Sequence, residues 1–203
     1  MRPFNVKLLC CFGLLAGLAI IVGCGSSDLL DPLAGNDYLA SISLTGGDGD
    51  APNDLEVFAS ADCDGNATTD DPEPGLAGIV GTLTIQSSAD APFLQIRQYR
   101  VDYIPQQSPL IGGGTDLPPA LEPPETVEQT INVQPNGTVS APLNNIMTID
   151  TKLFYAFDPD GLGTFAQGIY VIRVTLYGED ENNQSVTLPI DTVVRMMDID
   201  NCD

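Results

Sequence analysis

Apolar and polar residues alternate in short runs along most of the chain after residue 37. A period of two residues is typical of a β-strand that buries one face. The runs with this pattern cover residues 38–44, 55–61, 79–86, 99–103, 127–133, 168–177 and 186–196. Clusters of Gly, Pro, Asn and Asp separate them, and no run outside the N-terminal segment shows a helical period. The pattern therefore predicts an all-β domain of roughly eight short strands.

The last two runs are joined by a polar turn, Gly178–Gln184, and this arrangement predicts a β-hairpin. Pro189 lies inside the second run. Because proline has no N–H group to donate to a ladder, we expect it at a sheet edge or at a bulge.

Two of the runs resemble strands of a known class of extracellular module. The residues that carry the resemblance in the first are Gly168, Tyr170, Ile172, Val174 and Gly178, and the second run is Tyr99–Tyr103. They are similar to the penultimate strand with its turn, and to the central strand, of immunoglobulin-like and fibronectin type III-like domains. The resemblance implies an immunoglobulin-like antiparallel β-sandwich over residues 38–203, and it bears on fold more than on function.

Residues 104–125 interrupt the rhythm of strands and are rich in proline and glycine. A loop of this length is usually functional or irregular. Its polyproline-like pieces are preorganised for docking. An exposed loop that bridges two sheets is the alternative.

The chain begins with a short basic stretch, Met1–Lys7, and an apolar stretch, Leu8–Val22. The apolar stretch is shorter than the roughly 20 residues that span a bilayer, and it fits a signal peptide. Ile21–Cys24, with a small glycine directly before the cysteine, resembles the lipobox of bacterial lipoprotein precursors. The resemblance implies a signal peptide over residues 1–23 and a lipidated Cys24. An ordinary secretory signal with a chance cysteine is the alternative.

Residues 24–37 are expected to form the lipidated cysteine and a flexible tether that spans on the order of 20 Å. Acyl chains on Cys24 would anchor the protein stably in a membrane. Gly25 follows, where an aspartate would retain a lipoprotein in the inner membrane under the sorting rule of enteric bacteria. We therefore expect an anchor in the cell envelope, and the missing aspartate favours the outer membrane.

Charge limits the partners of the chain. The sequence has 28 acidic and 7 basic residues, and its formal net charge is −21. Loss of Arg2 and Lys7 with the signal peptide would lower this charge to −23. Such a surface repels phosphate, so nucleic acid is not an expected partner. A cationic protein or surface, or a metal ion, fits better, and solubility in salty surroundings is the alternative explanation.

Histidine and tryptophan are both absent. Without histidine, neither a Ser-His-Asp nor a Cys-His nucleophile can form, and an imidazole zinc site is excluded. The absence of tryptophan weighs against stacking on sugars. No pair of carboxylates stands out for glycosidase-type chemistry. We therefore do not expect an enzyme.

Two cysteines remain after Cys24, namely Cys63 and Cys202. In an exported chain such a pair predicts one disulfide. It would tie the end of the last strand to the loop after an early strand. Free redox-active thiols are the alternative, although the CxxC spacing is missing.

Oxygen-bearing side chains gather around Cys63 at the spacing of calcium ligands. They are Asp62, Asp64, Asn66, Thr68, Asp70 and Glu73. The spacing resembles that of an EF-hand calcium loop, and hard oxygen ligands suit Ca²⁺. Ala67 replaces the glycine of that loop, and Pro72 and Pro74 exclude the helix that normally follows. A calcium loop of another type and a plain acidic turn both remain open.

The sequence thus predicts a lipid-anchored cell-envelope protein with a non-catalytic binding or structural role. Two alternatives are a calcium-stabilised adhesion module and an acidic accessory subunit that docks on a basic envelope protein. The adhesion module would depend on calcium for stability. The accessory subunit would show salt-sensitive binding.

Overall fold

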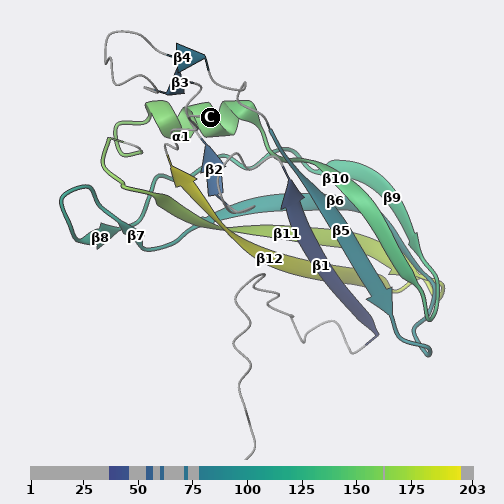
Figure 1. Cartoon of the computed structure of the whole chain (residues 1–203). Helices are drawn as coiled ribbons and strands as arrows, with labels where there is room; N and C mark the ends of the chain where they lie inside the picture. Colours follow the sequence, from purple (N-terminus) through teal and green to yellow (C-terminus); the bar gives the residue numbers. More distant parts are fainter. Residues whose placement is uncertain are drawn as a thin grey trace, which may run out of the picture.

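Two mainly antiparallel sheets packed face to face make up the fold (Figure 1). The structure is a computed structural model that describes residues 37–45, 54–56, 60–61, 71–72, 78–161 and 163–197. The three-stranded sheet has the order β1 (Tyr38–Thr45), β5 (Ile79–Ser87), β10 (Thr138–Met147). The five-stranded sheet has the order β2 (Asp54–Glu56), β12 (Ser185–Met197), β11 (Gly168–Asp180), β6 (Leu94–Pro105), β9 (Val127–Val133). The prediction of an all-β sandwich is confirmed.

The smaller elements lie outside these two sheets. They are the strand pairs β3 (Ser60–Ala61) with β4 (Asp71–Pro72) and β7 (Ser108–Pro109) with β8 (Thr115–Asp116), and the helix α1 (Ile149–Phe157). Among the described residues no helix has the length and apolarity needed to cross a membrane.

The core lies between the two sheets and follows the alternation of each strand. On β5, Leu83 and Ile85 point inward and are fully buried, while the residues between them face outward. On β11, Ile172 and Val174 do the same from the opposite sheet. The apolar inward faces of the two sheets therefore pack against each other and form the core.

The strand β6 (Leu94–Pro105) is longer than the sequence predicts. The prediction was too short because a bulge shifts the alternation of buried and exposed residues. Ile96 and Tyr99 are both buried although they lie three residues apart. The ladder to β11 shifts register here, since Tyr177 pairs with Gln98 and Gly178 pairs with Ile96. A bulge of this kind inserts one extra residue and reverses the side on which later residues point. The alternation read from residue 99 onward therefore missed the first part of the strand.

Gly178 is required where the bulge brings β6 and β11 together. A Cβ atom there would contact the backbone of Gln95 and Ile96, and the Cβ–Cα distance to Ile96 would be only 2.9 Å. This close approach is a structural reason for a glycine inside a strand.

Three further expectations need correction. Residues 55–61 were expected to be one strand, but the described parts belong to two short strands, β2 and β3, in different sheets. No helix was expected after the signal segment, yet α1 follows β10. The strand β10 was also missed. Its ladder is irregular between Leu143 and Met147, and Asn145 has a φ of 56°.

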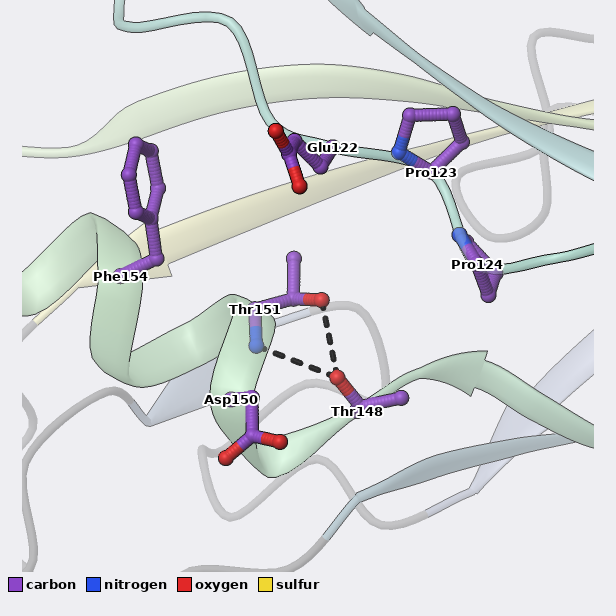
Figure 2. A pocket seen from close by; sticks show the side chains of 7 residues that line it. All are labelled: Glu122, Pro123, Pro124, Thr148, Asp150, Thr151 and Phe154. Atoms are coloured by element: carbon purple, nitrogen blue, oxygen red, sulfur yellow. Dashed lines mark hydrogen bonds between the residues drawn. The ribbon is translucent and has the colours of Figure 1, made fainter.

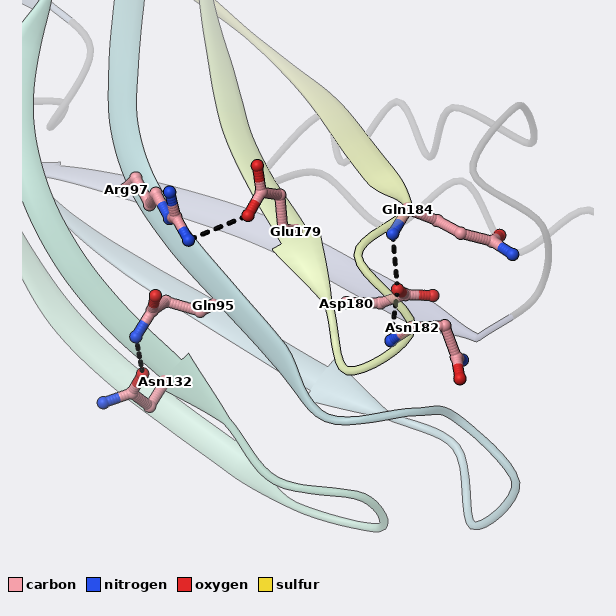
Figure 3. A network of polar contacts seen from close by, with 7 residues as sticks. All are labelled: Gln95, Arg97, Asn132, Glu179, Asp180, Asn182 and Gln184. Atoms are coloured by element: carbon pink, nitrogen blue, oxygen red, sulfur yellow. Dashed lines mark hydrogen bonds and ion pairs between the residues drawn. The ribbon is translucent and has the colours of Figure 1, made fainter.

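The hairpin at the end of the chain is confirmed, with β11 and β12 paired over their whole length. Asp180 builds the turn between them, because its carboxylate accepts the N–H groups of Asn182 and Gln184 at 2.8 Å each (Figure 3). Among the described strands Pro189 lies at an edge, as expected, since the described ladder between β2 and β12 covers Arg195–Met197 alone.

The sandwich has two distinct ends. Asp37 enters at one end, where its carbonyl accepts the N–H of Ser88 at 2.8 Å, and the loops 134–137 and 181–184 lie beside it. The strand β1 then runs toward the other end, which carries α1 and the β7–β8 pair (Figure 1). We call these the entry end and the α1 end.

Candidate functional site

A cleft of about 430 Å³ lies at the α1 end, between the first turns of α1 and the segment that leads from β8 to β9 (Figure 2). Its lining residues are Glu122, Pro123, Pro124, Thr148, Asp150, Thr151 and Phe154. Three come from the proline-rich segment, and four come from α1 or its cap. The cleft is therefore built by two parts of the chain that the sequence pattern did not place together.

The helix side of the cleft is fixed by a cap and by two buried residues. Thr148 is the N-cap, and its hydroxyl accepts the N–H of Thr151 at 3.1 Å. Lys152 and Tyr155 are fully buried on the inner side of α1. Lys152 makes a further interaction there, and the ring of Tyr155 packs edge-on against Tyr170, with 6.1 Å between ring centroids.

The other side of the cleft is held by one buried side chain and one hydrogen bond. Leu121 inserts into the core. Tyr170 donates its hydroxyl to the carbonyl of Pro119 at 2.9 Å. Pro123 and Pro124 come directly after Glu122, and their fixed φ angles keep this wall of the cleft extended.

The cleft offers negative charge beside apolar surface. Glu122 and Asp150 supply carboxylates from its two walls, and Phe154 supplies an aromatic ring that is 49% exposed (Figure 2). Asp150 also lies in the first turn of α1, where its charge offsets the positive end of the helix dipole. A ligand with positive charge and some apolar surface matches this lining.

Most of the exposed large apolar side chains of the described residues lie on elements at the α1 end. The large apolar residues that are exposed among the described part of the chain are Leu39, Val80, Ile111, Leu117, Ile149, Phe154 and Phe157. Three of them are on α1, and Phe157 is 76% exposed. Ile111 and Leu117 belong to the β7–β8 hairpin and its exit, which is bonded to the chain after α1 through the N–H of Ile111 and the carbonyl of Thr164. Apolar patches of this kind mark interaction sites.

The groups with shifted pKa values are tyrosines of the interior. Burial raises the pKa of Tyr155 to about 12 and also raises the pKa values of Tyr103 and Tyr170. Such phenols stay neutral and serve packing and hydrogen bonding. Within the described ranges, no group of three or more acidic or cysteine side chains is placed to hold a metal ion.

All of the predicted site residues lie outside the described part of the chain. They are Cys24, Cys63 and Cys202 and the calcium candidates Asp62, Asp64, Asn66, Asp70 and Glu73. The lipid anchor, the disulfide and the calcium site therefore stay predictions. The calcium candidates from Asp62 to Asp70 lie between β3 and β4 in the sequence, where an EF-hand loop would lie between helices, and Glu73 follows β4.

Met197 pairs with Glu56 in the parallel ladder between β12 and β2. Cys202 and Cys63 follow these two residues in the sequence, and both lie outside the described ranges.

The cleft itself was missed by sequence reasoning. The prolines that form one wall were noted as preorganised for docking, but α1 was not expected. The only available signal for α1 was the run of residues 149–157 after Thr148, which has no glycine or proline. Its apolar residues are not on one face, because Phe154 and Phe157 are exposed while Lys152 is buried.

No family model matches this chain, and no curated protein matches it. Among solved structures it is similar to one described as the X-ray structure of Northeast Structural Genomics Consortium target SoR45, with a TM-score of 0.35 and 10% sequence identity. The match covers 80% of this chain and 87% of that one.

Proposed function

We propose that this chain is a lipid-anchored cell-envelope protein with a non-catalytic binding role, and that it binds its partner at the α1 end. The observation that carries the proposal is the position of the exposed apolar side chains. Five of the seven lie on α1 or at the β7–β8 hairpin. These elements are at the end opposite to Asp37, where the predicted tether joins the fold.

The α1 end would be accessible to a partner because the predicted tether joins the fold at the opposite end. An anchor on Cys24 and a tether over residues 24–37 would hold the entry end toward the membrane. Strand β11 has 13 residues, so the α1 end stands about 40 Å beyond the entry end, at about 3.3 Å per residue. The cleft and its apolar surroundings then face away from the bilayer.

The chemistry of the cleft favours a basic polypeptide as the partner. Glu122 and Asp150 provide negative charge, and Phe154 provides a face for an arginine or lysine side chain. The net charge of the whole chain draws such partners toward the surface. This is the role of an accessory subunit that docks on a basic envelope protein. The calcium-stabilised adhesion module remains a separate prediction that rests on residues outside the described part.

The binding proposal is tested by NMR titration of the isotope-labelled chain in detergent micelles with a peptide of alternating arginine and leucine. We expect shifts at Glu122, Asp150, Thr151 and Phe154, and none in loop 134–137. A peptide with glutamate in place of arginine should not bind, because it carries the same sign of charge as the cleft.

Two matched double variants distinguish binding in the cleft from general electrostatic attraction to the acidic chain. Glu122→Gln with Asp150→Asn should weaken binding by about tenfold. Asp90→Asn with Glu181→Gln removes the same charge from exposed positions at the entry end and should leave affinity unchanged. Equal losses in both double variants would show that only net charge matters and would contradict the proposal.

A further inference from the structure

The three-stranded sheet differs from the rest of the chain because it carries no charge. Charged residues make up 17% of the sequence, yet β1, β5 and β10 contain none. Hydroxyl side chains dominate its outward positions and lie in register. Ser41, Thr84 and Ser140 form one row across the three strands, and Ser43, Thr82 and Pro142 form the next. We call the outward surface of this sheet the neutral face.

The outward surface of the five-stranded sheet has the opposite character. It carries ion pairs that join β6 to β11 (Arg97 and Glu179, 2.8 Å) and β11 to β12 (Arg173 and Asp191, 2.7 Å), and one within β6 (Arg100 and Asp102, 2.5 Å). The pair from Arg97 is drawn in Figure 3. The lack of charge on the other sheet is therefore a property of that sheet and not of β-strands in this chain.

From this contrast we infer that the neutral face packs against the same face of a second copy of this chain. Two copies with a net charge of about −20 each repel one another over most of their surfaces. The neutral face is the broad surface of the described strands on which they can approach without bringing like charges into contact. A two-fold contact uses the same patch on both subunits, and an uncharged patch satisfies that condition without any complementary pattern.

The tether selects face-to-face packing over pairing of sheet edges. Two copies anchored in one membrane must both direct their entry ends toward it. Sheets packed face to face about a two-fold axis along the strands keep both Asp37 residues on the same side. Antiparallel pairing of β1 with its copy would place them at opposite ends. The inference thus rests on the anchor of the proposed function, but not on the cleft.

The size of the neutral face indicates a weak contact that depends on the anchor. Three strands about 4.8 Å apart, with about eight residues each, offer about 400 Å² per copy. Stable complexes bury about 800 Å² per partner. Confinement to one membrane raises the effective concentration of copies, which compensates for a small interface.

The test measures energy transfer between donor- and acceptor-labelled copies of the lipid-modified full chain in vesicles of neutral lipid, labelled at the exposed Asn182. The wild type should show transfer above the level of randomly placed copies. Thr82→Glu and Thr82→Lys should each lower the dimer fraction at least fivefold, because either charge is buried without a partner. A mixture of the two variants should restore transfer.

Controls distinguish this contact from general charge effects and from failure of the anchor. Thr187 is an exposed threonine of β12, and its changes to Glu and Lys should leave transfer unchanged. If only net charge mattered, energy transfer would change in opposite directions in the Glu and Lys variants, relative to the wild type. Flotation with the vesicles reports anchoring separately. If the chain does not float, the same labels and variants are read in solution at about 1 mM. Random transfer for the wild type, or equal transfer in the Thr82 and Thr187 variants, would overturn the inference.

Discussion

Buried tyrosine hydroxyls connect the two sheets at the α1 end. Tyr99 and Tyr103 on β6 donate to the carbonyls of Asn144 and Ile146 in the irregular part of β10, the latter at 2.7 Å. Tyr155 differs from them, because its buried hydroxyl meets no hydrogen-bond partner among the described residues. A buried polar group without a partner costs stability, and one with a partner contributes to it.

These two environments predict opposite effects of the same substitution. Tyr155→Phe should raise the free energy of unfolding by about 1 kcal/mol, because it removes an unsatisfied hydroxyl. Tyr103→Phe should lower it by about 1–3 kcal/mol, because the carbonyl of Ile146 loses its donor. Urea unfolding of both variants checks the pair. Destabilisation by Tyr155→Phe as large as that by Tyr103→Phe would contradict this assignment.

The same tyrosines predict loss of stability in alkali. Burial raises the pKa of Tyr155 from 10.0 to about 12, so the folded state holds its proton more tightly than the unfolded state does. Stability should therefore be insensitive to this group below about pH 10 and fall as pH rises toward about 12. Unfolding measured from pH 9 to 12 should show a shallower decline for Tyr155→Phe than for the wild type. Identical slopes would argue against a shifted phenol.

At the scale of elements, strands with regular alternation of apolar and polar residues could be predicted from the sequence, and irregular segments could not. The strands β9 and β12 were predicted to within one residue at each end, and β11 was predicted except for its last three residues, because each alternates regularly. The first part of β6 could not, because the bulge near Arg97 reverses its phase. The helix α1 was invisible because its buried residues are a lysine and a tyrosine. The cleft was missed for the same reason, since the sequence pattern singled out only the proline-rich wall.

The short helix depends on its cap. Nine residues are too few for a helix to be stable by itself, so its ends matter. Thr148→Ala should lower the free energy of unfolding by about 1 kcal/mol, because the N–H of Thr151 loses its acceptor. Thr138→Ala, at an exposed position of β10, is the control and should change it by less than about 0.5 kcal/mol. Thermal unfolding of the two variants gives the comparison.

At the scale of the whole molecule, the fold separates three surfaces by their chemistry. The α1 end gathers exposed apolar side chains beside carboxylates, the outer face of the large sheet is covered with ion pairs, and the small sheet is neutral. Composition could show a strongly acidic chain, but not this separation, because it arises from strand order and register. In the proposed anchored protein, the direction in which the α1 end points would follow from where the predicted tether joins.

The most direct test of the account is the orientation of the anchored chain, measured by energy transfer to acceptors on lipid headgroups. Donors are placed at Asn182, at the entry end, and at Asp160, which follows α1. We expect strong transfer from Asn182, weak transfer from Asp160, and none from either in a Cys24→Ser chain. Equal transfer from the two positions, stronger transfer from Asp160, or transfer that survives Cys24→Ser would contradict an anchored protein that presents its α1 end away from the membrane.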